Sequence, residues 1–209
     1  MHMTIIDTTK KTQRKAYLKL LDAGKGIALS LVDLLPFFSI KDMFGAVQEC
    51  RCAVSDILFY KKVSGFLEEV EKSNVTDQQI DNFKLEISTI DNFEQKIHEY
   101  LLNLINNAES EDKARIMGYI YVAAVSKNID ADMMLRLCSI VNKIFIRDLY
   151  ELPKYVDSSA EDSIAANNFI TAGLIDSYVG GSWVNAPSYK LNLLGETLYN
   201  ILNQNKWFK

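Results

Sequence analysis

Ten consecutive residues without a charge, Ile116 to Val125, constrain this 209-residue chain more than any other stretch. A helix that is apolar on every side is normally buried in the middle of a domain. Ser110 is a suitable N-cap for such a helix, and Glu111 and Asp112 place negative charge at the end that the helix dipole favours. Asn128 is able to take the left-handed conformation that ends it. The sequence therefore predicts a buried central helix.

A second helix follows and completes a helical hairpin over Ser110 to Leu152. Asp130 is its expected N-cap, and Pro153 is expected to end it. Its apolar residues recur at helical spacing along one face: Met134, Leu137, Cys138, Val141, Phe145, Leu149 and Leu152. We expect the other elements to pack around this hairpin.

Three more helical patterns precede the hairpin. One runs from about Ile40 to Glu71, and Gly65 is a weak point in it because glycine lowers helix stability. Thr76 and Gln79 form a capping box that opens a short helix. A third runs from Asp91 to Ala108. The expected inward residues are Phe44, Val47, Val54, Ile57, Leu58, Val63, Phe66, Leu67 and Val70, then Ile80, Phe83 and Ile87, then Phe93, Ile97, Tyr100, Leu101, Leu104, Ile105 and Ala108.

The last quarter of the chain changes character. We expect a helix over Ile164–Ile175 with Gly173 near its end, a small β-hairpin near Tyr178 to Leu191, and a last helix over Leu193–Trp207 capped by Asn192. This order is typical of the end of a winged-helix domain. The predicted fold is mainly α: a helical bundle around the central hairpin with a winged-helix-like C-terminal element. The predicted domains are 1–40, 41–153 and 154–209.

The N-terminal segment carries an uneven charge. Residues 10–25 hold six basic side chains and one acid, so this block is +5 while the whole chain is −4. The basic block overlaps the first half of a helical apolar stripe over Thr12–Leu35. A loop that contains Phe37 and Phe38 follows this stripe. The stripe either packs on the protein's own core or lies in an anionic membrane surface. The candidate membrane or partner surface consists of Lys11, Arg14, Lys15, Lys19, Lys25, Phe37 and Phe38.

The sequence lacks the common marks of catalysis. It has no Walker-type loop, no dinucleotide-binding glycine motif and no nucleophile elbow. His98 and Cys138 could form a Cys–His pair, but no signature surrounds either, and the spacings of structural zinc sites are missing. The acidic pairs Glu68–Glu69 and Glu111–Asp112 read as ordinary surface charge. We therefore predict a protein that is not an enzyme, with no cofactor and no metal site.

DNA binding is the alternative that the winged-helix pattern raises. The predicted recognition helix, residues 160–175, has no lysine or arginine, and the hairpin has only Lys190. Asn167 and Asn168 are able to read adenine, but base readout also needs basic residues for the phosphates. Protein–protein contact therefore ranks above nucleic-acid binding, although the sequence names neither the partner nor the oligomeric state.

Several apolar and charged patterns along most of the chain resemble bacterial proteins of the abortive-infection alpha type, which act in phage defence. The matching stretches are Arg51-x₃-Ser55-Asp56-x₂-Phe59-Tyr60-Lys61-Lys62-x₃-Phe66-Leu67, Lys113-Ala114-x₃-Gly118, Asp148-Leu149-x₂-Leu152, Gly173-Leu174-Ile175 and Tyr189-x-Leu191-x₂-Leu194-Gly195-x₂-Leu198. The resemblance implies an all-α protein with a winged-helix-like end and no catalytic residue. Together these observations predict a regulatory or interaction protein in the cytoplasm, with peripheral association at the inner membrane face as a further expectation.

Overall fold

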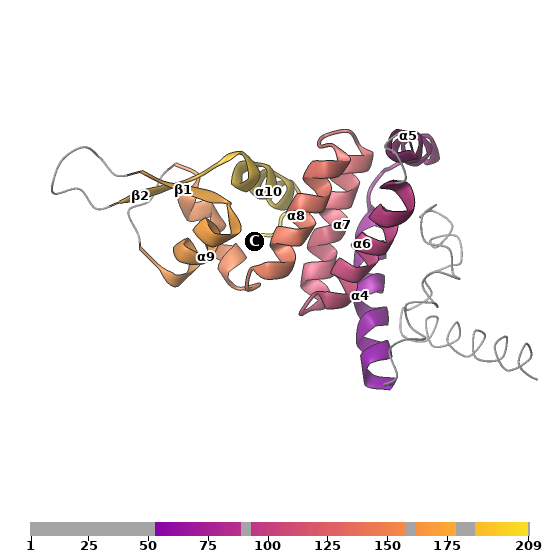
Figure 1. Ribbon diagram of the computed structural model, residues 1–209, viewed down its shortest axis with the longest axis horizontal. Coiled ribbons are helices and arrows are strands. Elements are labelled where there is room, and N and C mark those ends of the chain that lie inside the picture. Colours follow the sequence, from indigo (N-terminus) through magenta and orange to yellow (C-terminus); the bar gives the residue numbers. More distant parts are fainter. Residues whose placement is uncertain (1–52, 89–92, 158–161, 179–186, 209) are drawn as a thin grey trace, which may run out of the picture. The chain divides into compact units, whose positions relative to one another are not determined.

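The computed structural model describes residues 53–88, 93–157, 162–178 and 187–208 (Figure 1). These residues form seven α-helices, one 3₁₀-helix and one antiparallel pair of strands. The elements are α4 (Ala53–Lys72), α5 (Asp77–Ser88), α6 (Phe93–Asn107), α7 (Glu111–Val125), α8 (Ala131–Lys143), η1 (Asp148–Tyr155), α9 (Ile164–Ala172), β1 (Ile175–Tyr178), β2 (Ser188–Leu191) and α10 (Leu193–Gln204). The predicted mainly α fold with one small β-sheet near the C-terminus is confirmed.

The chain divides into two compact units between Arg115 and Ile116, within α7. The predicted helix over Thr12–Leu35 and the beginning of the helix near Ile40 lie outside the described residues. The sequence-based domain limits near 40 and 153 stay predictions. No helix among the described residues is both long enough and apolar enough to cross a membrane.

In the N-terminal unit, α6 packs against both α4 and α5. The buried face of α4 comprises Phe59, Val63, Phe66, Leu67 and Val70. Leu58 was predicted to point inward, but it is 51% exposed. At 100° per residue, it lies about a quarter turn away from the stripe that Phe59 belongs to.

Among the predicted inward side chains of α5 and α6 that the structure describes, all but one are buried, and the side chain of Phe93 lies outside the described set. Ile80, Phe83 and Ile87 of α5 are buried, and so are Ile97, Leu101, Leu104, Ile105 and Ala108 in and after α6. Tyr100 was expected in this stripe, but it lies at the edge of the stripe and is 44% exposed. A tyrosine at that position keeps its polar hydroxyl end near water while its ring covers apolar neighbours.

Local capping signals in the sequence set the helix starts. Thr76 and Gln79 satisfy each other before α5: the Thr76 N–H donates to Gln79 Oε1 over 2.9 Å, and the Gln79 N–H donates to Thr76 Oγ1 over 3.3 Å. The Lys113 N–H donates to Ser110 Oγ over 3.3 Å at the start of α7. Asp130 accepts from the Met133 N–H over 2.7 Å at the start of α8. All three predicted caps are confirmed.

The end of α7 differs from the prediction by one residue. Lys127, and not Asn128, takes the left-handed conformation, with φ 63°. The N–H of Asn128 donates to the Ala123 carbonyl, and the N–H of Lys127 donates to the Ala124 carbonyl. These two bonds are the Schellman arrangement, which fixes the left-handed residue by where the carbonyls lie. The backbone geometry therefore outweighs the preference of asparagine.

The second helix of the central hairpin is shorter than predicted. α8 ends at Lys143 because Ile144 is extended, with φ −81° and ψ 139°. A separate 3₁₀-helix, η1, then contains Pro153 instead of being stopped by it, and Phe145 is exposed. The run Ile144-Phe145-Ile146 explains the break, since β-branched and aromatic residues lose side-chain freedom in a helix.

The same break changes one predicted ion pair. Asp132 and Arg136 pair over 2.6 Å within α8, as their spacing predicts. Arg147 and Glu151 are also four residues apart, a spacing that would favour an ion pair in an α-helix, but Glu151 pairs with Lys154 over 3.4 Å. Residues three apart share a face in a 3₁₀-helix, whereas residues four apart do not. The local helix type therefore decides the partner.

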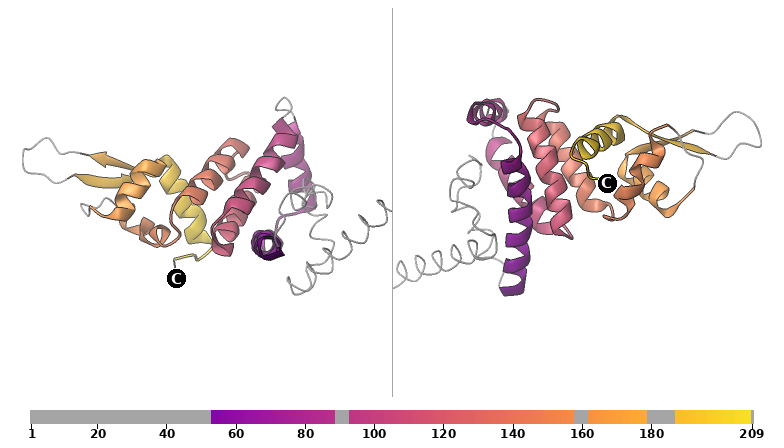
Figure 2. Two further views of the ribbon diagram at one scale, coloured as in Figure 1. Left: turned by 60° about the horizontal axis from the view of Figure 1, so that its bottom comes forward. Right: turned by 180° about the vertical axis from the view of Figure 1, so that it is seen from behind.

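The ten residues that open the C-terminal unit are the buried helix that the sequence predicts. Eight of the residues from Ile116 to Val125 are buried, and Tyr119 and Val122 are half-buried. The views in Figures 1 and 2 agree that this part of α7 lies beside α8. On α8, Met134, Leu137, Cys138 and Val141 are buried, which confirms its predicted apolar face.

After η1, the chain forms α9, the β1–β2 sheet and α10. Ser163 caps α9, and Gly173 ends it in the left-handed conformation with φ 76°. Ile175 was predicted in this helix but begins β1, where it pairs with Leu191. One face of the sheet buries Ile175, Tyr189 and Leu191 against the unit's core.

The beginning of α10 fits closely onto the end of α9. Asn192 Oδ1 accepts from the N–H groups of Leu194 and Gly195, which confirms the predicted cap. The Leu174 carbonyl accepts from the Asn192 N–H over 3.0 Å. A Cβ on Gly195 would lie 2.1 Å from that same carbonyl oxygen, so this crossing requires glycine. α10 ends at Gln204, three residues before the predicted end.

Candidate functional site

The N-terminal residues predicted to contact a membrane or partner lie outside the described residues. This holds for the whole set of Lys11, Arg14, Lys15, Lys19, Lys25, Phe37 and Phe38. Two surfaces within the described residues carry clustered polar or exposed apolar side chains. One is the carboxylate cluster around Arg115, and the other is the outer face of α9.

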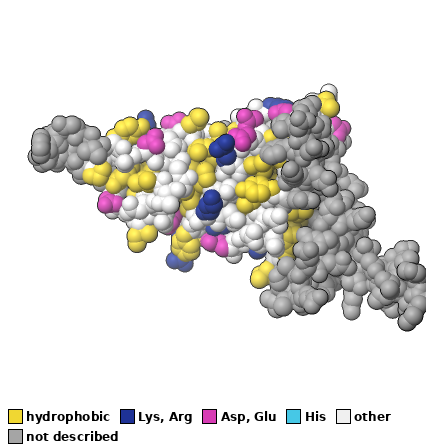
Figure 3. All heavy atoms as spheres, viewed as in Figure 1, with side chains coloured by type: hydrophobic (Ala, Val, Ile, Leu, Met, Phe, Trp, Pro, Cys, Tyr) yellow, Lys and Arg dark blue, Asp and Glu magenta, His cyan; other side chains and the backbone are white. Residues whose placement is uncertain are grey.

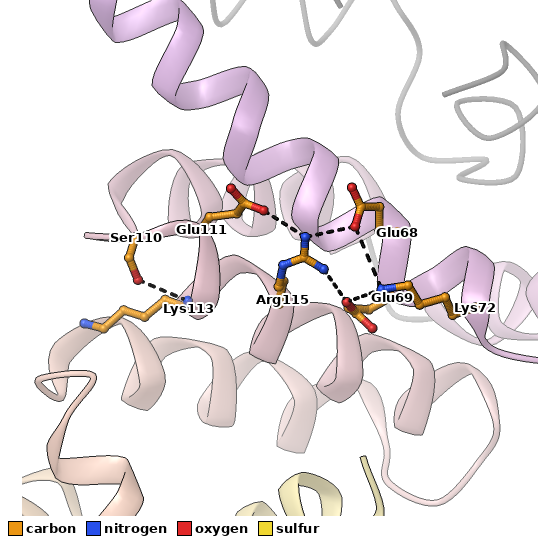
Figure 4. A network of polar contacts seen from close by, with 7 residues as sticks. All are labelled: Glu68, Glu69, Lys72, Ser110, Glu111, Lys113 and Arg115. Carbon is orange, nitrogen blue, oxygen red and sulfur yellow. Dashed lines mark hydrogen bonds and ion pairs between the residues drawn. The ribbon is translucent and has the colours of Figure 1, made fainter. Parts of the chain in front are cut away.

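Arg115 joins three carboxylates from two helices (Figure 4). Its guanidinium donates to Glu69 over 2.5 Å and to Glu68 over 2.9 Å, both on α4, and to Glu111 over 2.8 Å on its own helix. Lys72 adds a second cation, 3.0 Å from Glu69. The Glu69 side chain is only 7% exposed, so these two cations neutralise a carboxylate that is largely removed from water.

The close approach of α4 to α7 makes this cluster possible. Gly65 lies one helical turn before Glu68 and Glu69, and a Cβ on it would be 2.9 Å from Glu111 Cγ and 3.2 Å from Arg115 Cγ. Gly65 is therefore a contact point between helices, and not merely the weak point that the sequence predicts. The prediction of ordinary surface charge is wrong for Glu69, which is nearly buried, whereas Glu68 and Glu111 stay partly exposed and Glu111 lies in the first turn of its helix as predicted.

The chemistry of the Arg115 cluster is structural. Burial by itself lowers the pKa of Arg115, but the hydrogen bonds to Glu111, Glu68 and Glu69 outweigh it and raise that pKa above its usual value. Three carboxylates surround this guanidinium, so the cluster has no excess of positive charge that would attract a phosphate or a carboxylate ligand. Lys113 of the same helix is also almost fully buried, but its side chain points away from Arg115 (Figure 4) and pairs with Glu109 over 3.1 Å.

The state of the Cys138 thiol does not support the Cys–His pair with His98 that was considered from the sequence. Cys138 is fully buried, and burial raises its pKa above the usual range. The thiolate is the nucleophilic form, so a thiol held protonated in the core is inert. The side chain of His98 lies outside the described residues, as do Cys50 and Cys52. Among the described residues, no group of histidine, cysteine and acidic side chains is arranged to hold a metal ion.

The outer face of α9 is the second surface. Ala165, Ala166 and Phe169 face inward, and the Phe169 ring forms a T-shaped contact with the Tyr155 ring of η1, with 5.7 Å between centroids. The outward residues lie three and four positions apart: Ile164, Asn167, Asn168 and Thr171. Ile164 is 80% exposed, the largest exposed fraction among the large apolar side chains described.

Both asparagine amides on this face are already used as donors. Asn168 Nδ2 donates to Asp148 Oδ2 of η1 over 2.7 Å. Asn167 Nδ2 donates to Asp162 Oδ1 over 3.3 Å and to the Ser163 carbonyl over 3.2 Å. Bidentate readout of adenine needs the amide N–H as a donor to the base. Asn167 uses both of its amide N–H groups in these contacts and Asn168 uses one, and each amide lies beside a carboxylate.

The surroundings of α9 are neutral to acidic and partly apolar. Residues 162–178 and 187–208 contain three acids, Asp162, Asp176 and Glu196, against two lysines, Lys190 and Lys206. Four large apolar side chains of these elements are exposed: Ile164, Ile170, Tyr178 and Leu193. Figure 3 shows that hydrophobic and uncharged atoms make up most of the visible surface over α9 and the sheet.

Sequence reasoning identified Asn167 and Asn168 but missed Ile164 as a surface residue. The periodicity of α9 contained the signal, because Ala165, Ala166 and Phe169 define an inward face that excludes Ile164. For the Arg115 cluster, the i to i+4 spacing of Glu111 and Arg115 was a signal, but their α4 partners were not visible from spacing.

We compared the chain with protein-family models, curated proteins and solved structures, and found no significant match in any of the three.

Proposed function

We propose that this protein is a non-enzymatic interaction or regulatory module of a bacterial cell or mobile element, and that the outer face of α9 binds a protein partner. The observation that carries the proposal is Ile164, an 80% exposed apolar side chain on a helix face with no lysine or arginine. An exposed apolar residue next to polar groups is a common anchor in protein interfaces. The resemblance to abortive-infection alpha proteins supports a phage-defence context.

The inert state of the groups that could carry chemistry supports the non-enzymatic part of the proposal. The Cys138 thiol is buried and protonated, and the Arg115 guanidinium is held by three carboxylates. Neither group is available as a nucleophile or as an anion-binding site.

A matched pair of surface substitutions tests the proposal. Ile164→Asp changes the α9 face, and Leu58→Asp changes a 51% exposed apolar side chain on α4. Both variants should keep the thermal stability of the parent, because neither residue belongs to the core. We expect Ile164→Asp to weaken partner binding, measured with the purified partner by calorimetry, at least tenfold. Equal affinities for parent and Ile164→Asp would contradict the proposal.

The partner itself is to be found by photo-crosslinking from position 164 in bacteria that carry the gene. Crosslinking from the exposed position Asn82 on α5 serves as the control. A protein captured from position 164 and not from position 82 is then purified for the calorimetric test. Loss of phage protection in cells that express Ile164→Asp, but not Leu58→Asp, would connect the surface with the proposed context.

DNA binding is the second candidate, because α9, the two strands and α10 follow one another in the order of a winged helix. The carboxylates bonded to Asn167 and Asn168 and the net charge of −1 over the described part of residues 162–208 weigh against it. Fluorescence anisotropy with duplex DNA decides between the two. Sub-micromolar binding that weakens steeply with salt would favour DNA binding and reverse our ranking.

Peripheral membrane association through the basic N-terminal segment remains a separate proposal. Its support is the +5 charge of residues 10–25 next to an apolar run. We expect co-sedimentation with vesicles that contain anionic lipid, at about 1 kcal/mol for each basic residue near the surface. Replacement of Lys11, Arg14, Lys15 and Lys19 by glutamine should abolish it, and equal sedimentation of both proteins would reject the proposal.

A further inference from the structure

Residues 206–208, which follow the C-cap residue Asn205 of α10, turn back onto the C-terminal unit. Lys206 takes the left-handed conformation with φ 59°. Its N–H donates to the Asn203 carbonyl, and the Trp207 N–H donates to the Leu202 carbonyl, both over 3.0 Å. This Schellman arrangement is the same one that Gly173 makes after α9, where the N–H of Leu174 donates to the Phe169 carbonyl. Lysine here occupies a position that glycine fills at lower conformational cost.

The turn delivers two aromatic rings to two earlier elements. Trp207 stacks on Tyr150 of η1, with 5.5 Å between ring centroids and 21° between planes. Phe208 stacks on Tyr199 of α10 with nearly the same geometry, 5.5 Å and 22°. Residues 206–208 therefore form a short strap that connects the end of α10 to η1. Tyr150 stays 52% exposed beneath this contact.

The closed strap carries two unfavourable features. The first is the left-handed lysine, since non-glycine residues rarely adopt that conformation. The second is the indole N–H of Trp207, which is buried and has no hydrogen-bond partner among the described residues. A buried donor without an acceptor loses its hydration and gains nothing in return. Two ring stacks and two backbone hydrogen bonds favour the closed strap and offset these two costs.

We propose that residues 206–208 are a releasable strap, which opens locally while the remainder of the C-terminal unit stays folded. Opening removes the left-handed turn, rehydrates the Trp207 indole N–H and frees the Tyr150 ring on η1. The closed and open states then differ by less free energy than the folded and unfolded states of the whole unit. This inference is independent of the proposed role of Ile164.

Hydrogen exchange in the full chain tests the strap. A Trp183→Phe variant leaves Trp207 as the sole tryptophan, since the sequence contains two. We expect the Trp207 indole and backbone N–H groups to exchange at least about a hundredfold faster than the N–H groups of Leu198 and Leu202 inside α10, because local opening is cheaper than global unfolding. Equal protection of all these groups would overturn the proposal.

Two substitutions at one position separate the strap from general stability. Lys206→Gly and Lys206→Ala both remove the ammonium group, but only glycine removes the left-handed penalty. Lys206→Gly should raise the protection of the Trp207 N–H groups about two- to fivefold, and Lys206→Ala should not. Protection that is equal in the two variants overturns the proposal, even if the Trp207 N–H groups exchange quickly.

Discussion

Arg115 shows how one side chain acquires importance from neighbours far away in the sequence. Its partners Glu68 and Glu69 lie 47 and 46 residues before it, and only the packing of α4 on α7 brings them together. Removing one partner of such an ion pair leaves a charge that has lost its compensation. The carboxylate most affected is Glu69, which is almost buried.

We predict that Arg115→Met lowers the free energy of unfolding by about 2 kcal/mol or more, since breaking a buried ion pair is strongly destabilising. Arg136→Met is the control, because the Arg136–Asp132 pair is exposed on both sides. Urea unfolding should show no measurable change for the control. Equal midpoints for the two variants would mean that the Arg115 cluster contributes no more than a surface pair.

Two glycines of the C-terminal unit should respond to alanine very differently. Gly173 has a positive φ but open space around its Cβ position, so Gly173→Ala should cost about 1 kcal/mol of stability. Gly195 has an ordinary φ, but its Cβ would collide with the Leu174 backbone carbonyl. We expect Gly195→Ala to be the more destabilising by at least 2 kcal/mol, because backbone has to move. Thermal unfolding of both variants measures the difference.

We expect the burial of the Cys138 thiol to make the stability of the protein depend on pH. Burial raises its pKa in the folded protein, so the folded state keeps the proton that the unfolded state loses above about pH 8.5. The contribution of this thiol to the free energy of unfolding is therefore fully present below that pH. Above it the free energy of unfolding falls as pH rises, with a slope approaching about 1.4 kcal/mol per pH unit. In a Cys50→Ser, Cys52→Ser background, a further Cys138→Ala change should reduce the slope between pH 8.5 and 9.5. An unchanged slope would contradict the assignment.

Capping residues explain where helices begin, and the sequence shows them directly. The Thr76–Gln79 box, Ser110, Asp130 and Asn192 were all expected at the positions where the structure has them. The predicted helix ends were less accurate, at α7, α8, α9 and α10. A helix end depends on which carbonyls remain unsatisfied and on what the next residues pack against, as Lys127 and Ile144 show.

We predict that Thr76→Ala lowers stability by about 1 kcal/mol, because it removes an N-cap oxygen from α5. Thr76→Ser keeps that oxygen and should retain most of the stability. Chemical denaturation of the three proteins checks this. A serine variant as unstable as the alanine variant would show that the hydroxyl is not the source of the effect.

For the whole chain, we expect the far-ultraviolet circular dichroism of the intact protein to show well over a third helix, the average for globular domains. The small β1–β2 sheet should contribute little to that spectrum. A strand-dominated spectrum would contradict the fold. The measurement covers the full chain, so it also reports on residues 1–52, for which the sequence predicts a helix over Thr12–Leu35.

The sequence alone determined the fold class, the buried helix Ile116–Val125, the capped helix starts and the neutral character of α9. These features depend on residues three or four positions apart or on composition, and both can be read from a linear chain. The tertiary structure alone decided the Arg115 cluster and the need for glycine at positions 65 and 195. Each of these depends on which backbone approaches which side chain across tens of residues, and periodicity contains no information about that distance.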